Sequence, residues 1–254
     1  MIDDSVRATS FGVAARDYDR YRVGPPPEIV ARVIPTPCGS VLDLGAGTGA
    51  LTRLLMGRIP QVTAIEPDQR MREVLFENCP GVTVLAGTAE RIPLPEASVD
   101  AVVVSSAWHW MNPQRAIPEI GRVLRKSGTL GLIWIRRDRT VPWVSDLESF
   151  RRRVTRSDDQ VEKNIRYYLE EPWLPDGAPF TDVEISALPW RAEMTRDELC
   201  GLLTTFTGYI TAPEERKPGI LREFTAYVND DARLGSGDTV EMPMLCHYWR
   251  ARRQ

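Results

Sequence analysis

Residues 41–49 read Val-Leu-Asp-Leu-Gly-Ala-Gly-Thr-Gly, a short apolar run that ends in a series of glycines. The apolar run predicts a buried strand, and the segment after it, 50–58, predicts a helix. Glycine lacks a Cβ atom, so Gly45, Gly47 and Gly49 can adopt unusual dihedral angles and let a ligand contact the backbone. A strand, a glycine turn and a helix in this order are typical of proteins that bind nucleotide-like cofactors.

Two kinds of cofactor suit this loop. Counted from Gly45, the letters fit G-x-G-x-x-A with Ala50 in last place, which is the fingerprint of dinucleotide-binding folds. Asp43 favours a different ligand, because a carboxylate at the buried end of a strand needs a cationic or donor partner. S-adenosylmethionine has an ammonium, a sulfonium and no phosphate, so an acidic floor suits it and would repel a pyrophosphate. The alternative is that Asp43 only caps the turn by accepting backbone N–H bonds.

A second acidic residue follows the next predicted strand, residues 61–65. Glu66 stands about 20 positions beyond the glycines, where an acid in doubly wound sheets accepts hydrogen bonds from ribose hydroxyls. Pro67 and Asp68 come next, and both residue types favour the start of a helix. Glu66 could instead begin that helix and face solvent. The position supports a ribose-containing cofactor but does not distinguish the two candidates.

A third block decides between them. A predicted strand at 82–86 is followed by Gly87-Thr-Ala-Glu-Arg-Ile-Pro-Leu-Pro-Glu-Ala-Ser-Val-Asp100 and a further strand at 101–105. With the two earlier blocks, in the same order and at similar spacing, this segment resembles the class I S-adenosylmethionine-dependent methyltransferases. Within them it is similar to the type 11 group, which includes trans-aconitate-methyltransferase-like enzymes. The resemblance covers residues 38–135 well and both ends more loosely.

The resemblance implies a fold and an activity. The expected fold is a Rossmann-like α/β fold, with a seven-stranded, mostly parallel sheet, an antiparallel C-terminal strand and helices on both faces. The expected activity is methyl transfer from S-adenosylmethionine to a small-molecule acceptor, on the oxygen of a hydroxyl or a carboxylate. Two alternatives remain, an NAD-dependent oxidoreductase and a non-catalytic methyltransferase-like binding protein. The oxidoreductase is disfavoured by Asp43.

The same resemblance assigns cofactor-binding positions. Many relatives have at the position of Thr88 an Asp that accepts a bond from the adenine amino group, whereas a threonine accepts without a charge. Tyr21 and Arg22 belong to an N-terminal segment that folds over the cofactor in related enzymes, where they could meet the methionine carboxylate or simply dock the helix. The full expected set is Asp43, Gly45, Ala46, Gly47, Glu66, Pro67, Thr88, Ala89, Glu90, Ser105, Tyr21 and Arg22.

His109 is the candidate catalytic residue. It lies in Ser-Ser-Ala-Trp-His-Trp, residues 105–110, directly after the fourth predicted strand. An imidazole can accept a proton at neutral pH, and a hydroxyl nucleophile needs such a base whereas a carboxylate does not. The alternative is that Trp108, His109 and Trp110 form the wall of the cofactor pocket. His247, in the last predicted strand, is interpreted as structural.

Two groups of arginines allow two interpretations each. Arg136, Arg137 and Arg139 follow the fifth predicted strand and either hold a carboxylate-bearing acceptor, as the resemblance suggests, or lie in a solvated loop. The run 151–153 consists of three arginines and is interpreted as a solvated helix face.

Composition limits the other classes of function. A chain of 254 residues with a net charge of −3 is long enough for one large core and lacks the basic balance of a nucleic-acid-binding protein. It has no run of about 20 apolar residues, and its N-terminus lacks the pattern of a signal peptide. Its four cysteines are scattered, which argues against a metal site or disulfides and for the reducing cytoplasm. We therefore expect a cytoplasmic enzyme without a metal, a nucleic-acid partner or a membrane partner.

The chain is expected to form a single domain over 1–254. Its parts are an N-terminal helical lid (1–37), a cofactor-binding core (38–135), and a substrate-side insertion with C-terminal strands (136–254). Further predicted helices cover 68–78, 113–125 and 196–206, and further predicted strands cover 129–135, 183–190 and 240–249.

Overall fold

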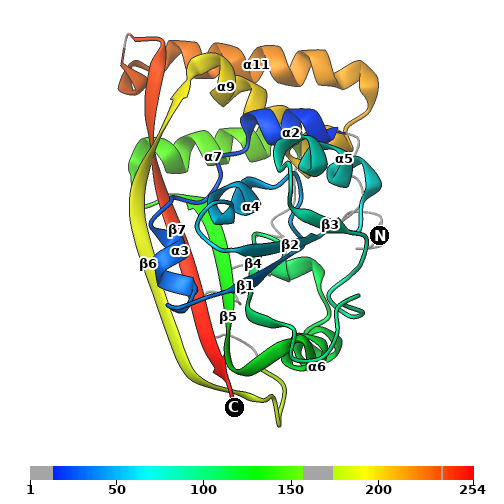
Figure 1. Cartoon of the computed structure of the whole chain (residues 1–254). Coiled ribbons are helices and arrows are strands. Elements are labelled where there is room, and N and C mark those ends of the chain that lie inside the picture. Colours follow the sequence, from blue (N-terminus) through cyan, green and yellow to red (C-terminus); the bar gives the residue numbers. More distant parts are fainter. Residues whose placement is uncertain (1–13, 157–173, 236) are drawn as a thin grey trace. The chain divides into compact units, whose positions relative to one another are not determined.

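Seven strands form one sheet in the order β3-β2-β1-β4-β5-β7-β6 (Figure 1). This computed structural model describes residues 14–156, 174–235 and 237–254. Strands β1 to β5 pair in parallel, and β7 runs antiparallel between β5 and β6. The expected fold class, a mostly parallel sheet with antiparallel C-terminal pairing and helices around it, is therefore confirmed. The strands are β1 (Ser40–Leu44), β2 (Gln61–Ile65), β3 (Thr83–Leu85), β4 (Val99–Ser105), β5 (Leu124–Arg137), β6 (Phe180–Thr195) and β7 (Thr239–Arg253).

The chain divides into two compact units, which we describe separately. Unit 1 contains the described parts of 1–23, 136–161 and 189–245, and unit 2 contains those of 24–135, 162–188 and 246–254. Strands β5, β6 and β7 each have residues in both units. The expected single domain stays a prediction.

Unit 2 contains the predicted cofactor-binding core. All five residues of β1 are buried, as is usual for a parallel strand that is covered on both faces. Its helices are α3 (Ile29–Val33), α4 (Ala50–Leu55), α5 (Gln69–Asn78), the 3₁₀ turn η2 (Trp108–Trp110) and α6 (Pro113–Val123). The hydrophobic core of unit 2 includes Leu42, Leu44, Val102, Val104, Trp108, Ile117, Ile120, Leu130, Leu132, Trp134 and Trp249.

The strand register brings the chemically interesting segments to one edge of the sheet. Asp43 lies beside Ala64 on β2 and beside Val103 on β4. Since these strands are parallel, their carboxyl ends meet at the same edge. The glycine loop, Glu66 and the segment after Ser105 all follow strands that end there.

Unit 1 is mainly helical in the part that the structure describes. Its α11 was not predicted, although its buried Ile220, Phe224 and Val228 recur every four residues. The Phe150 ring of α7 stacks on Tyr227 of α11, with ring centroids 4.0 Å apart. The helices are α2 (Ala15–Tyr21), α7 (Pro142–Thr155), α9 (Arg196–Gly201), η3 (Leu202–Thr205), α10 (Thr207–Ile210), η4 (Glu214–Arg216), α11 (Lys217–Asp230) and η5 (Ala232–Leu234).

Several predicted boundaries are wrong. Helix α4 ends three residues earlier than expected. Gly57, just beyond its end, has a positive φ of 72°, and an α-helix cannot continue through a residue with this angle. Helix α6 ends at Val123, and β5 begins at the next residue rather than at Thr129. The helix expected at 196–206 is α9 followed by the 3₁₀ turn η3. Of the N-terminal lid, residues 1–13 lie outside the described part.

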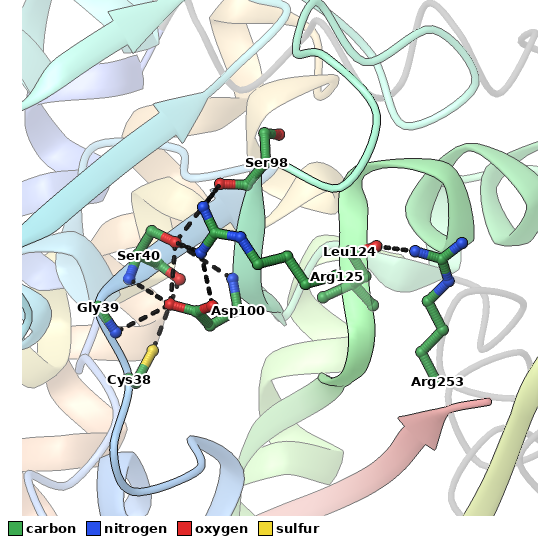
Figure 2. Close-up of polar contacts among 8 residues, drawn as sticks. All are labelled: Cys38, Gly39, Ser40, Ser98, Asp100, Leu124, Arg125 and Arg253. Carbon is green, nitrogen blue, oxygen red and sulfur yellow. Dashed lines mark hydrogen bonds and ion pairs between the residues drawn. The ribbon is translucent and has the colours of Figure 1, made fainter.

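A polar network ties together the amino ends of β1 and β4 (Figure 2). Asp100 Oδ2 accepts hydrogen bonds from the backbone N–H groups of Gly39 and Ser40, both at 2.9 Å. Asp100 Oδ1 lies 2.6 Å from Nη1 of Arg125, which also donates to the backbone oxygen of Ser98 through Nη2. Partial burial opposes the charge of Asp100, but these donors hold the pKa of the carboxyl below its ordinary value. The network fixes the sheet at the edge opposite to the glycine loop.

Asp100→Asn is expected to lower the free energy of unfolding by about 1–3 kcal/mol at pH 7, because the Gly39 and Ser40 N–H groups and the Arg125 guanidinium lose a charged acceptor. The lowered pKa means that this stabilisation is present above about pH 4 and is lost as the pH falls through the native-state value. Denaturant unfolding at pH 7 and pH 3 tests this. The exposed variant Glu96→Gln should leave stability unchanged, and an equal loss for Asp100→Asn at both pH values would contradict the account.

No helix in the described part of the chain is both long and apolar enough to cross a membrane. The four cysteines, all within the described residues, are free thiols.

Candidate functional site

The glycine loop of unit 2 is fixed to the neighbouring strand. The backbone N–H groups of Gly45 and Ala46 both donate to the carbonyl oxygen of Ile65, at 2.8 and 3.0 Å. Gly45 and Gly47 have backbone φ angles of 72° and 58°, which residues other than glycine rarely adopt. A Cβ atom on Gly45 would contact Ala107, whereas one on Gly47 would meet nothing within 4 Å. The loop is thus packed beneath Gly45 and open above Gly47.

Asp43 is fully buried at the end of β1, as predicted. Its Oδ2 accepts a hydrogen bond from the Thr52 hydroxyl of α4 at 2.6 Å, while its Oδ1 has no partner among the described residues. Burial, with a smaller contribution from the charge of Glu66, raises the pKa of Asp43 to about 7. A buried carboxylate oxygen without a donor is costly, so this geometry suits a bound cation or donor.

Glu66 connects the glycine loop to the turn after β2. Its Oε2 accepts from the Gly47 backbone N–H, and its Oε1 accepts from the Asp68 backbone N–H, both at 2.9 Å. Each carboxylate oxygen can accept a second bond, so both retain capacity for a ligand hydroxyl. Burial raises the pKa of Glu66, although these two N–H donors lower it. Glu66 therefore does not simply face solvent, which was the alternative interpretation.

The remaining expected positions of unit 2 differ in exposure. Pro67 and Thr88 are exposed, and Ala89 is buried. Glu90 Oε1 accepts from the backbone N–H of Asn112 at 2.8 Å, so this side chain holds the start of α6. Ser105 is half-buried at the end of β4. The contacts of these residues with a cofactor stay predictions.

His109 lies in η2, directly after β4, and its Nδ1 atom is buried. The imidazole ring packs against Trp110, with centroids 4.7 Å apart and planes tilted by 48°. Trp108 is only 2% exposed and belongs to the hydrophobic core. Both roles of His109, base and wall, stay predictions.

Tyr21 and Arg22 belong to unit 1 and contact η3 and its neighbours. A Cβ atom on Gly201 would lie 2.5 Å from the Tyr21 ring, so α2 packs closely where only glycine fits. Arg22 donates from Nε to the Thr205 hydroxyl at 2.9 Å and from Nη2 to the Thr205 carbonyl at 3.0 Å. These contacts support the docking interpretation, and a contact with the methionine carboxylate stays a prediction.

Three arginines of unit 1 surround one aromatic ring. The guanidinium carbons of Arg22, Arg137 and Arg151 lie 4.3, 5.0 and 4.1 Å from the centroid of the Phe206 ring. Glu148, which is 4% exposed, forms ion pairs with Arg137 at 2.5 Å and with Arg151 at 3.1 Å. Burial alone would raise the pKa of Glu148, but the two arginines hold it at about 2. We call these five residues the arginine cluster.

The arginine cluster corrects one prediction and adds residues that the sequence did not reveal. Arg151 is buried, so the run 151–153 is not uniformly a solvated face. The spacing of Glu148 and Arg151, three positions apart on a helix, was an available signal for their pairing. Thr205 carried no such signal, because its partner Arg22 lies 183 positions away. Thr52 was missed as the partner of Asp43, although it lies in the first turn of the predicted helix.

The residues of unit 2 fit the expected cofactor. The unpartnered Asp43 oxygen suits the cationic part of S-adenosylmethionine, the remaining acceptor capacity of Glu66 suits ribose hydroxyls, and the open side of Gly47 leaves space for them. Glu66 suits the ribose of either cofactor, whereas the buried Asp43 carboxylate would repel a pyrophosphate, which disfavours a dinucleotide.

Comparison with known proteins agrees with this geometry. Residues 42–132 match a family described as "Methyltransferase domain". The chain is 38% identical over 236 residues to the "uncharacterized methyltransferase Rv3342" of Mycobacterium tuberculosis, covering 93% of this chain and 92% of that protein. It is 28% identical over 246 residues to the "uncharacterized methyltransferase-like C25B8.10" of Schizosaccharomyces pombe, covering 94% and 93%.

A solved structure shares the fold. It is that of a proposed type II methyltransferase from Anaeromyxobacter dehalogenans, with a TM-score of 0.66 and 23% sequence identity. The match covers 92% of this chain and 98% of that one. At this level of identity the likeness concerns the fold alone.

Proposed function

Because this chain belongs to the class I methyltransferases of the type 11 group, which use S-adenosylmethionine, we propose a specific reaction for it. The chain transfers the methyl group to an oxygen atom of a small-molecule acceptor. The observation that carries the assignment of the cofactor-binding residues is the buried Asp43 oxygen, which has no partner among the described residues. Asp43 lies near the carboxyl end of β1, beside Ala64 of β2, and the glycine loop with Gly47 follows the same end of β1.

The proposed mechanism gives each residue of unit 2 one role. S-adenosylmethionine supplies an activated methyl group on a sulfonium. Asp43 compensates positive charge from the floor of the site, and Glu66 holds the ribose hydroxyls while it fixes the Gly47 backbone. Alignment of this kind can supply roughly 7–11 kcal/mol of the barrier, so little covalent help from the protein is required.

His109 is proposed to accept the proton of a hydroxyl acceptor. The support is the position of His109 in η2, which begins three residues after Ser105, the last residue of β4. A carboxylate acceptor has no proton to lose and would leave His109 with a packing role. The identity of the acceptor oxygen and the role of His109 are thus coupled.

His109→Ala is expected to lower the methylation rate of a hydroxyl acceptor by about 100- to 10,000-fold while cofactor affinity is preserved, because a general base contributes this much. Rates are measured at saturating acceptor and cofactor, and affinity is measured by calorimetry. His247→Gln serves as the control and should keep the wild-type rate. Full turnover by His109→Ala would assign the ring to the wall of the site.

The function as a whole is tested in two steps. S-adenosylmethionine should raise the melting temperature of the wild-type protein and NAD should not, since a ligand of the native state stabilises it. A panel of small hydroxyl and carboxyl compounds is then screened for release of S-adenosylhomocysteine. Stabilisation by NAD alone, or binding of S-adenosylmethionine without turnover of any compound, would contradict the proposal.

A further inference from the structure

We propose that Arg72 is a positioning residue for Glu66: its guanidinium group holds the turn after β2 in the form that presents the Glu66 carboxylate to the ribose of the cofactor. Arg72 lies in the first turn of α5 and is half-buried. The part of this proposal that concerns the cofactor rests on the proposed function above. The part that concerns the Glu66 carboxylate holds for the free protein.

A single nitrogen of Arg72 connects α5 to the turn that precedes it. Nη1 donates hydrogen bonds to the backbone oxygen of Glu66 at 2.8 Å and to that of Pro67 at 2.6 Å. Both residues precede Asp68, the N-cap of α5, so their oxygens lie outside the hydrogen bonds of the helix itself. The guanidinium group therefore makes a link between helix and turn that the helix backbone would not make.

The same turn is fixed through Glu66 itself. The Glu66 backbone N–H donates to the Leu85 backbone oxygen of β3 at 3.2 Å, and the carboxylate accepts from the N–H groups of Gly47 and Asp68. Arg72 binds the remaining backbone group of Glu66, its carbonyl oxygen. Every polar group of Glu66 thus has a partner, and loss of Arg72 would release the backbone on one side of the carboxylate.

The place of Arg72 in α5 is unfavourable for the helix itself. The N-terminus of a helix carries partial positive charge, so acids stabilise the first turn and cations destabilise it. The first turn of α5, all of it within the described residues, has arginines at positions 70 and 72 and no acid. Arg70 forms an ion pair with the N-cap Asp68 at 2.9 Å. Helix electrostatics do not favour an arginine at position 72, whereas the two carbonyl contacts give it a role.

Arg72 also acts on the charge of Glu66. Burial, the largest influence, raises the pKa of the Glu66 carboxyl, and the negative charge of Asp68 raises it further. The backbone N–H groups of Asp68 and Gly47 lower this pKa, and so does the positive charge of Arg72. Asp43, on β1, also interacts with Glu66. Removal of Arg72 should therefore let Glu66 take up a proton at a higher pH, and a protonated carboxyl has less capacity to accept from ribose hydroxyls.

A titration of the free protein tests the effect on Glu66 without any activity. The side-chain carboxyl carbon of Glu66 is followed by carbon-13 NMR, and its signal is assigned by its absence in Glu66→Gln. In Arg72→Met the midpoint of the titration should lie at a higher pH than in the wild type, because the nearby positive charge is lost. Arg72→Lys should keep the wild-type midpoint. It keeps the charge, and a lysine ammonium can donate to both carbonyl oxygens from one nitrogen, as Nη1 does.

Calorimetry with S-adenosylmethionine at pH 8 tests the positioning role. Arg72→Met should weaken binding by about three- to tenfold, since the released turn loses part of the charge-assisted ribose contact. Arg72→Lys should restore most of the affinity. The control is Arg115→Gln, which replaces an exposed arginine of α6 in the same unit and should match the wild type in both measurements.

Each measurement has a result that would overturn the proposal. An unchanged midpoint for Glu66 in Arg72→Met would refute the effect on its charge, and unchanged affinity of this variant would refute the positioning role. An equal loss of affinity in Arg72→Lys and Arg72→Met would also contradict it, because lysine restores both the charge and the donor. If Arg72→Met does not fold, Arg72→Gln replaces it in the titration, and a wild-type midpoint would again overturn the proposal. Failure of the proposed cofactor site is distinguishable, since Glu66→Ala would then leave the affinity unchanged as well.

Discussion

Glu66→Ala is expected to weaken the binding of S-adenosylmethionine at least tenfold. The variant loses the ribose contacts, and charge-assisted bonds of this kind contribute about 1.5–3 kcal/mol each. It also frees the backbone N–H of Gly47, which Glu66 holds at 2.9 Å, so the glycine loop loses part of its fixed geometry. Isothermal calorimetry at pH 8 measures the effect directly.

The control for Glu66→Ala is Glu73→Ala, an exposed acid on α5. It removes the same charge from unit 2 without a contact to the glycine loop and should leave affinity within twofold of wild type. Glu66→Gln separates the two contributions, because the amide keeps one acceptor oxygen and loses the charge. Unchanged affinity of Glu66→Ala would remove this residue from the site.

Asp43→Asn is expected to have opposite effects on cofactor affinity and on the stability of the free protein. Cofactor affinity should fall at least tenfold at pH 8, because the amide no longer compensates the positive charge of the ligand. The free energy of unfolding should rise at the same pH, since the amide oxygen can still accept from Thr52 and no buried charge remains. Such a gain in stability with a loss of binding is typical of functional sites.

The pH dependence of stability follows from the raised pKa of Asp43. The native carboxyl titrates near 7, whereas an unfolded Asp titrates near 3.9, so between these values the native state binds more protons than the unfolded state. Wild-type stability should therefore decrease as the pH rises from about 4 to 7, by on the order of 4 kcal/mol at most. The Asp43→Asn protein should lack this contribution, and the two stability curves should converge toward pH 4.

Denaturant unfolding from pH 4 to pH 8, paired with calorimetry of cofactor binding, tests both effects. Wild-type affinity should decrease below pH 7, where Asp43 takes up a proton, and the variant should lack this part of the decrease. Asp230→Asn, which replaces an exposed acid, is the control and should change neither curve. A destabilised Asp43→Asn protein at pH 8 would contradict the cost that we assign to the buried charge.

The part of the fold that could be predicted from the sequence is the part with local signals. The strand before Gly45, the acid after β2 and the turn after β4 each stand next to the element that positions them, and the parallel sheet then brings them to one edge. Helix α11 was not predicted, although Pro218 near its start and the helical spacing of its buried face were available signals. Helix ends were least predictable, since packing and a single left-handed residue decide them.

The arginine cluster shows why the rest could not be predicted. Arg151 and Arg153 have the same chemistry and are two positions apart, yet one is buried and the other is exposed. Arg151 packs on Phe206, which lies far away in sequence and belongs to another part of the chain. The apolar residues Val144, Leu147 and Val154 mark the face of α7 that includes Arg151, but nothing within the helix identifies Phe206 as its partner.

The discontinuous make-up of both units has a consequence for any attempt at dissection. A polypeptide truncated after Ile135 would retain the glycine loop and every assigned cofactor-binding position of unit 2. It would nevertheless lack Trp249 and Ala251, which are 2% and 1% exposed and complete the same core as Trp134. Excision of the family segment alone would therefore leave a hole in its own interior, and minimal fragments or chimaeras must carry the last strand with them.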